Sequence, residues 1–413
     1  MTVPTVQAFI NFSTGPSFAQ AMILDTGILD TNILADAVSV IVDVSNQINA
    51  ISIQRGRNAQ ADQFQAGTLS LRIIDQNGDF NPQNVSGPYY NLLQPMIKVS
   101  ITATSLGVVY PLFSGFVTNY LTTQPNNSID TLNYTTIQAV DAMRLVQMAQ
   151  ITTVAGSSAG DLTSTRVSQI LDQISWPSTM RSIETGLSTV QANPDTATTA
   201  LSAAQKCELV EFGAFYVDAS GSFVFKNRTT TSTSVSGTPK VFDDTGAHLH
   251  YYNAEWILND ILVYNQASIT RIGGTAQTYT DAASVTKYFA HSYNQTATMF
   301  SSDDDALKYA QAYIASRAET SIRCDALILD LYYPDAAMVL AALELDFFDP
   351  VTISTTQPGG SVLTKTLQVF GVNYQISPNS WRQTFTTLEP IIDSFILDST
   401  LYGILDDTSV LSY

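Results

Sequence analysis

Apolar and polar residues alternate along two long stretches of the chain, at about 38–140 and 241–387. Alternation with a period of two places one face of a β-strand on a core and the other face in solvent. The Asn77-Gly78 pair in the first stretch predicts a tight hairpin turn, because both residues accept a positive φ. We expect each stretch to form an antiparallel sheet closed into a barrel, with a sandwich as the alternative for the first.

The residues between these two stretches have apolar positions at helical spacing instead. The segments 165–174 and 195–211 show this spacing, and Pro194 precedes the second, where proline favours the start of a helix. The segment 212–225 then predicts two strands, so that this part forms a small α+β unit. Runs rich in Gly, Ser and Thr at 152–163 and 228–240 predict linkers.

One helix is expected within the second alternating stretch. Ser302 and the three carboxylates at 303–305 would begin it, because a hydroxyl and negative charges are favourable at the free N–H groups of a helix N-terminus. The segment 306–317 would continue it, with Arg317 near its C-terminal end.

These patterns divide the chain into five parts. They are an N-terminal arm (1–37), a first β domain (38–150), an α+β insertion with linkers (151–240), a second β domain (241–390) and a C-terminal arm (391–413). The fold class is therefore mainly β, with two β-barrel domains flanking a small α+β domain. A length of 413 residues agrees, because domains of about 150 residues would give two to four.

The two arms share an Ile-Leu-Asp pattern, which occurs in 23–36 and again in 396–407. Short apolar arms of this kind usually need a partner to cover them. The alternative is that they fold back on their own chain.

The charge of the chain argues against one class of function. It contains 36 Asp and Glu against 18 Lys and Arg, a net charge of −18. A surface that binds nucleic acid needs clustered cations instead. An acidic surface suits a wall that DNA passes without sticking, or it simply keeps a large protein soluble. We expect no export signal, because the N-terminus lacks a basic segment followed by an apolar one, and no membrane anchor, because no apolar run approaches about 18 residues. Cys207 and Cys324 are expected to be buried thiols.

Two motifs could carry chemistry. The segment 156–160 matches the Gly-x-Ser-x-Gly nucleophile elbow, which works only on a sharp turn from a strand into a helix, whereas here it falls in a linker. His248 and His250 would point to one face of a strand and could bind a metal with ligands from elsewhere, or could form an ordinary surface pair. His291 stands alone among polar residues.

Two acidic groups have simpler explanations. Asp75, Asn77 and Asp79 have the spacing of a calcium loop, but the glycine falls at the fourth position and no acid follows at the twelfth, so a hairpin turn accounts for them. The acids at 303–305 are explained by the helix start. P-loop, dinucleotide and zinc patterns are absent from the sequence. We therefore predict no catalytic, cofactor-binding or metal-binding residues, no cofactor and no enzymatic activity.

Three groups of motifs resemble one protein family. The first group consists of IQRGR (53–57), FQAGTLSLR (64–72), DQNGDFNP (75–82), SGPYY (86–90), LLQPM (92–96) and YPLFSGFV (110–117). The second consists of ISWP (174–177), RSIETG (181–186) and FYVDASGSFVF (215–225), and the third of NDILVYN (259–265) and RIGG (271–274). Together they resemble minor tail proteins of long-tailed bacteriophages (siphophages), which form the hub at the tail tip, and the resemblance covers about 45–390.

The resemblance implies a structural function. The family extends by fold to the baseplate hubs of myophages and to the spikes of type VI secretion systems, and three copies form a ring. Two tube-like β domains per chain give that ring a pseudo-sixfold face, which docks on the hexameric distal tail ring. The ring closes the tail channel until DNA ejection.

The resemblance also implies partners and a location. The partners are further copies of the chain, the distal tail protein, the tape-measure protein and tail fibre or tip proteins, while DNA passes through the channel without specific binding. The protein would be assembled in the host bacterial cytoplasm and reside at the tail tip of the virion. One alternative is a receptor- or carbohydrate-binding tail-tip protein that uses exposed members of its 19 tyrosines. A cell-wall glycan hydrolase ranks third, since its pair of carboxylates is defined by a distance in space.

Overall fold

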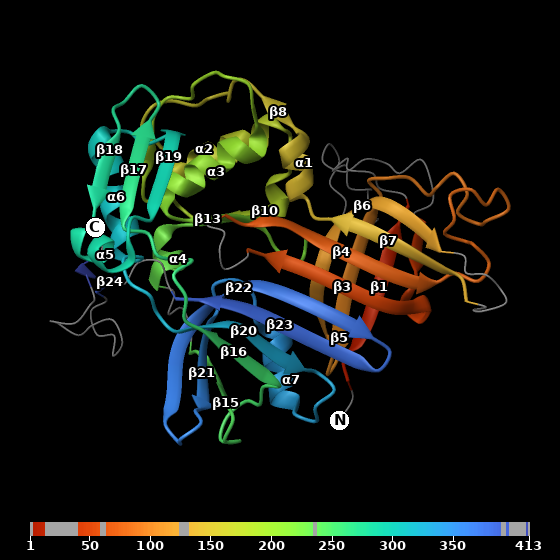
Figure 1. Cartoon of the computed structure of the whole chain (residues 1–413). Helices are drawn as coiled ribbons and strands as arrows, with labels where there is room; N and C mark the ends of the chain where they lie inside the picture. Colours follow the sequence, from red (N-terminus) through yellow and green to blue (C-terminus); the bar gives the residue numbers. More distant parts are fainter. Residues whose placement is uncertain are drawn as a thin grey trace.

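The computed structural model describes residues 3–12, 40–57, 63–123, 132–233, 238–389, 394–395 and 410–411. Strands dominate it, as the sequence predicts, and most of them belong to one 13-stranded sheet, called the shared sheet below (Figure 1). Its strands are β1 (Thr5–Asn11), β2 (Ile41–Asp43), β3 (Ile48–Gly56), β4 (Gln65–Ile74), β5 (Lys98–Ser105), β6 (Val108–Thr123), β7 (Tyr134–Val140), β15 (Lys240–Asp243), β16 (Asn253–Ile257), β20 (Arg323–Asp330), β21 (Pro350–Thr356), β22 (Val362–Ser377) and β23 (Ser380–Leu388).

The shared sheet joins the two predicted β domains and does not close into a barrel. Its order is β16-β20-β23-β22-β3-β4-β7-β6-β5-β1-β2, with β15 and β21 attached beside β22. The first β region (β1–β7) meets the second β region (β15, β16 and β20–β23) where β3 pairs antiparallel with β22. The prediction of two closed barrels is therefore wrong for the described strands. Alternation predicts which face of a strand is buried, but not which strand becomes its neighbour.

The two β regions have the same pattern of strand pairing, and the corresponding strands follow one another in the same order along the chain. In the first region β3 pairs with β4, β4 with β7, β7 with β6, and β6 also with β5. In the second region β16, β20, β23, β22 and β21 pair in the corresponding way. The long strands β6 and β22 each have six consecutive buried positions, 112–117 and 367–372, where each strand passes from one pairing partner to the other.

An α+β part lies between the two β regions in sequence. Its helices α2 (Thr163–Gln173) and α3 (Ala200–Glu211) pack on each other. The strands β10 (Arg181–Ile183), β13 (Ala214–Val217) and β14 (Phe223–Lys226) form a small sheet. The helix α3 begins at Ala200 and not directly after Pro194, because the side chain of Thr199 accepts a hydrogen bond from the N–H of Ser202.

Short elements connect these parts. They are the helices α1 (Met143–Met148) and α4 (Arg228–Thr233), the 3-10 turns η1 (Ser45–Gln47) and η2 (Ser178–Met180), and the strands β8 (Gln150–Ile151), β9 (Asp161–Leu162), β11 (Thr189–Val190) and β12 (Thr198–Thr199). The predicted linkers at 152–163 and 228–240 therefore contain β9 and α4.

A second small sheet and a helix lie beside α2 and α3 (Figure 1). The strands β17 (Gln266–Arg271), β18 (Gln277–Thr280) and β19 (Ser292–Thr298) form the sheet, and α6 (Asp303–Ala315) packs on β17. The helix begins as predicted, since Ser302 and Asp305 cap each other's backbone N–H groups. The remaining elements are α5 (Ala282–Tyr288), α7 (Ala336–Glu344) and the paired strands β24 (Ser394–Phe395) and β25 (Val410–Leu411).

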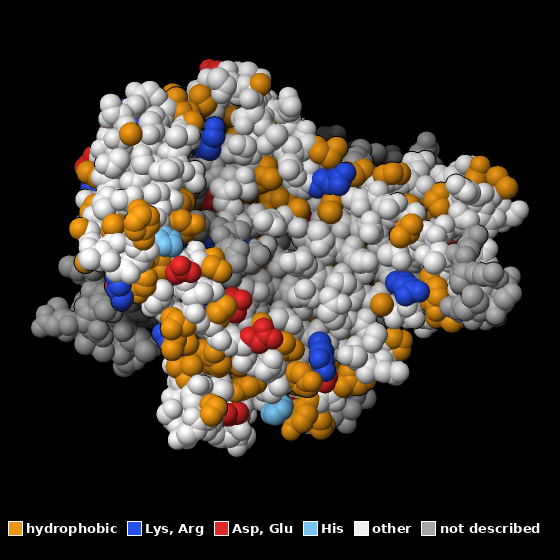
Figure 2. All heavy atoms as spheres, in the orientation of Figure 1, with side chains coloured by type: hydrophobic (Ala, Val, Ile, Leu, Met, Phe, Trp, Pro, Cys, Tyr) orange, Lys and Arg blue, Asp and Glu red, His pale blue; other side chains and the backbone are white. Residues whose placement is uncertain are grey.

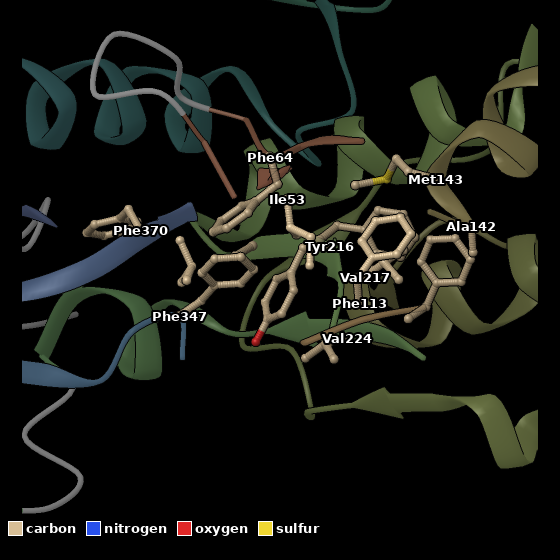
Figure 3. Close-up of a cluster of buried hydrophobic side chains, with 14 of the residues drawn as sticks. Ile53, Phe64, Phe113, Ala142, Met143, Tyr216, Val217, Val224, Phe347 and Phe370 are labelled. Carbon is tan, nitrogen blue, oxygen red and sulfur yellow. The ribbon is translucent and has the colours of Figure 1, made fainter. Parts of the chain in front are cut away.

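One core connects all these parts. Figure 3 shows Ile53 and Phe113 from the first β region, Tyr216 from the α+β part, and Phe347 and Phe370 from the second β region in one buried cluster. The ring centres of Tyr216 and Phe347 lie 5.2 Å apart, and the two rings are arranged edge to face. In the described part of the chain, no helix is long and apolar enough to cross a membrane. The Ile-Leu-Asp segments 23–36 and 396–407 lie outside the described residues.

The predicted hairpin at Asn77-Gly78 is wrong. Gly78 has a positive φ of 67°, but the next strand, β5, pairs with β1 and β6 and not with β4. After β4 the chain instead makes consecutive turns, in which the N–H groups of Gly78, Asn81, Asn84, Gly87 and Tyr90 each donate to the carbonyl three residues earlier. An Asn-Gly pair predicts a turn, but not where the chain goes afterwards.

Replacing Gly56 by alanine tests the close approach of β3 and β22. Gly56 has a φ of 102°, and a Cβ atom there would collide with the carbonyl oxygen of Phe370, whereas a Cβ atom at Gly107, φ 81°, would meet nothing within 4 Å. We expect Gly107→Ala to lower the free energy of unfolding by about 1–2 kcal/mol, the cost of the left-handed backbone. Gly56→Ala should lower it clearly further in denaturant titrations. Equal losses would contradict the close approach.

Candidate functional site

Two arginines of the IQRGR motif hold β3 against the second β region on the buried side of the shared sheet. Arg55 is 6% exposed, and its guanidinium lies 3.3 Å from both carboxylate oxygens of Asp346 and 4.8 Å from the ring centre of Phe347. The guanidinium of Arg57 lies 4.0 Å from the ring centre of Phe370. A planar guanidinium suits both a carboxylate and an aromatic face. The motif therefore forms the junction between the two β regions.

Asp141, at the end of β7, links β4 to α1. Its two carboxylate oxygens accept hydrogen bonds from the N–H groups of Gly67 (2.6 Å) and Met143 (2.9 Å). Burial raises the pKa of this carboxyl to about 7, although the two N–H groups and Arg55 favour the charged form. The folded protein therefore holds a proton on Asp141 over a range of pH in which the unfolded chain does not.

The opposite face of the shared sheet, called the exposed face below, is mainly polar over the eight strands from β16 to β6, although Leu121 of β6 is an exposed apolar side chain. One cross-strand row on it consists of Asp330, Arg382, Gln375, Ser52, Ser70, Gln138 and Asn119. A hollow of about 340 Å³ lies on this face across β3, β4 and β22. Figure 2 shows that most atoms in this area belong to neither hydrophobic nor charged side chains.

The charges on the exposed face are few and balanced. Its outward positions carry Glu255, Asp330, Arg72 and Arg382. The guanidinium of Arg72 lies 3.9 Å from the ring centre of Tyr134, and that of Arg382 lies 4.2 Å from the ring centre of Tyr252. Because tyrosine rings cover one side of both cations, the exposed face offers little that would grip phosphate.

The Gly-x-Ser-x-Gly motif is not assembled into a nucleophile site. Ser158 donates a hydrogen bond to the carboxylate of Asp161, and its carbonyl accepts one from Arg166. Its neighbours thus include an acid and a cation, but no histidine is among the hydrogen-bond partners described for Ser158. The geometry supports a hydrogen-bonded turn before α2.

Each of the three histidines has a different contact. A nitrogen of His248 lies 2.6 Å from a carboxylate oxygen of Asp243, while the ring of His250 stacks on Tyr333 with centres 4.3 Å apart. His291 lies 3.1 Å from the carbonyl oxygen of Tyr288. In the described residues, His, Cys, Asp and Glu form no group of three or more that could hold a metal ion.

The acidic groups stabilise local structure. Asp75 is buried and accepts hydrogen bonds from the N–H groups of Asp79 and Phe80 and from the hydroxyl of Thr135, which anchors the consecutive turns. The three acids of α6 have separate partners: Asp303 pairs with Arg271, Asp304 with Lys308, and Asp305 caps the helix.

A second hollow, of about 430 Å³, lies where β4, α3 and α6 meet. Aromatic side chains line much of it, among them Phe64, Phe212, Tyr293, Tyr309 and Tyr313. Its described lining includes no Ser, Cys or His, and its one carboxylate is that of Glu208.

One residue of the sequence indicates the junction between the two β regions, although the alternation of apolar and polar residues does not account for it. In β3 the buried positions are Ile51, Ile53 and Arg55, so an arginine occupies a position where alternation calls for an apolar residue. A charge that is taken out of water at such a position needs a partner of opposite charge. Its partner Asp346 is 291 residues away, and nothing in the local pattern identifies it.

The comparisons with known proteins agree on the fold. No protein-family model and no curated protein sequence matches the chain, whereas solved structures do. A tail protein from Neisseria meningitidis superposes with a TM-score of 0.56 at 8% identity, covering 94% of this chain and 97% of that chain. The 43 kDa tail protein of prophage MuSo2 from Shewanella oneidensis gives 0.53 at 10% identity, covering 85% and 96%.

A third solved structure is a component of the E. coli type VI secretion system. It gives a TM-score of 0.42 at 10% identity, covering 87% of this chain and 75% of that chain. The first two structures show that this chain has the fold of phage tail proteins, and the predicted resemblance to tail hub proteins is confirmed at the level of the fold.

The raised pKa of Asp141 predicts how stability depends on pH. Between about pH 4 and 7 the folded protein binds a proton that the unfolded chain releases, so raising the pH through this window lowers the free energy of unfolding. Asp141→Asn removes this contribution. We expect the stability of the native protein relative to Asp141→Asn to fall by several kcal/mol from pH 4 to pH 8, measured by denaturant titration at each pH. A difference that does not change with pH would contradict the assignment.

Proposed function

We propose that this protein is a structural hub at the distal tip of a siphophage tail, where three copies form a ring around the tail channel. The observation that carries the proposal is the shared sheet, which joins two repeats of one strand plan into a single wall with one buried and one polar face. A wall of this kind can line a channel with its polar face while its buried face keeps its shape. The fold likeness to phage tail proteins supports the proposal.

The repeat supports a role in matching symmetries. Two similar β regions per chain and three chains per ring would present six similar units around the axis. A ring of this kind can dock on a hexameric distal tail ring, although it contains only three chains. The same ring would close the channel until DNA ejection and anchor fibres or tip proteins on its outside, with the tape-measure protein as a further partner.

The exposed face supports the passage of DNA. Cations that neutralise phosphates release counterions, and each such contact strengthens binding. On the exposed face two acids offset two arginines, and a tyrosine ring covers one side of each arginine. DNA would therefore pass this wall without being held, and the excess of acids in the chain lies elsewhere.

Lysines on the exposed face test this function. We expect Ser52→Lys combined with Ser70→Lys to slow DNA release from virions several-fold, with a steeper dependence on salt, because the new cations face the DNA. Ala159→Lys, at an exposed position outside the sheet, should leave the release rate unchanged. An unchanged rate in the double variant would contradict the channel assignment.

The native mass of the purified protein tests the ring. Light scattering should give three times the chain mass of 44.8 kDa, and a tail reconstruction should show the protein on the tail axis. A peripheral position at fibre tips would contradict the hub and favour a receptor-binding role.

A further inference from the structure

Among the eight strands from β16 to β6, two edges have no partner strand in the described structure. The first is β16, at one end of the strand order. The second belongs to β6: on the side away from β7, this strand pairs with β5 only as far as Phe116, so 118–123 are left without a strand there. Free backbone N–H and C=O groups along such edges are templates for pairing with another chain.

The internal repeat shows what fits these edges, because β22 corresponds to β6. The strand β22 pairs with β21 as far as Gln368, where its pairing with β23 begins. The strand β6 pairs with β5 as far as Phe116, where its pairing with β7 begins. A shift of register follows at once in both strands, between Val369 and Gly371 and between Val117 and Asn119.

The partner of β22 then identifies the partner of β6. Past the register shift, β22 pairs with β3 on the side away from β23. In the plan shared by the two regions, β3 corresponds to β16, because each is the first strand and pairs with the second, β4 or β20. The equivalents of the two free edges are therefore already paired within the chain.

We infer that 118–123 of β6 pair antiparallel with β16 of a second copy of this chain, as β22 pairs with β3. The partner is a second copy because β6 and β16 lie at opposite ends of the eight strands and far apart in one molecule (Figure 1). The inference rests on the proposed ring and names the edges through which its copies join.

The internal pairing also fixes the register. The row Leu71, Ile137 and Tyr120 in the first region corresponds to the row Leu327, Phe385 and Val372 in the second. Thr123 lies three residues after Tyr120, as Gln375 lies three residues after Val372, so these two residues correspond. Ile51 lies opposite Leu71 and Ala254 lies opposite Leu327, so the next residues, Ser52 and Glu255, also correspond. Since Gln375 lies opposite Ser52, Thr123 lies opposite Glu255 of the next copy.

Paired cysteines test the register. In Thr123→Cys/Glu255→Cys, directly opposite Cβ atoms lie about 5 Å apart, within reach of a disulfide, and mild oxidation should link up to three chains covalently. The native Cys207 and Cys324 are free and buried, and burial raises the pKa of both thiols to about 12, so they should not react. Asn119→Cys/Glu255→Cys, displaced by four residues, is the matched control and should give little cross-linking.

Charges at the same position test the contact without oxidation. Thr123→Asp places a like charge opposite Glu255, whereas Thr123→Lys places an opposite charge there. We expect Thr123→Asp to weaken association of the copies several-fold and Thr123→Lys to leave it unchanged or strengthen it, measured by light scattering over a range of concentrations. Both substitutions change an exposed side chain, so the melting temperatures of the two variants should agree.

The outcomes separate this inference from the proposed function. A trimeric mass without cross-links at Thr123 would overturn the edge pairing and leave the ring standing. Cross-links that are strongest in the Asn119 variant would overturn the register. A monomeric mass together with a peripheral position in the tail would overturn the ring itself.

Discussion

The pairing of β3 with β22 is the constraint on which the rest of the structure depends. It brings together residues more than 300 positions apart, with Gly56 opposite Gly371 and Ser52 opposite Gln375. On its buried side the guanidinium of Arg55 is taken out of water and compensated by Asp346. Leaving a buried charge without its partner costs far more than the pair contributes. The junction is therefore stable only when both β regions are in place.

This constraint explains why the chain can act as one wall. The cluster that contains Ile53, Tyr216 and Phe370 draws side chains from both β regions and from the α+β part, so movement of one region would expose the core of the others. With its buried face filled in this way, the sheet can leave the other face polar. The function proposed for the protein uses that exposed face and the two edges at its ends.

The sequence predicted the parts of this structure that depend on neighbours along the chain. Alternation identified the strands, and Ser302 with its acids predicted the start of α6. The sequence did not predict whether the sheet closes into a barrel or in which order its strands lie, because alternation contains no information about the neighbouring strand. Asn77-Gly78 predicted a positive φ, which only Gly78 has, and a hairpin, which is absent, since the destination of the chain after a turn is decided by packing elsewhere. The role of Arg55 was signalled by its buried position, but Asp346 could be identified only in the folded chain.

Native-state hydrogen exchange measures the junction most directly. If β3 and β22 form one cooperative unit, their amide hydrogens exchange at similar, slow rates, because both strands open only together. Removing the charge with Arg55→Met should then accelerate exchange in both strands to the same extent. Faster exchange in β3 alone, with β22 as slow as in the native protein, would show that the two β regions are held independently and would contradict this account.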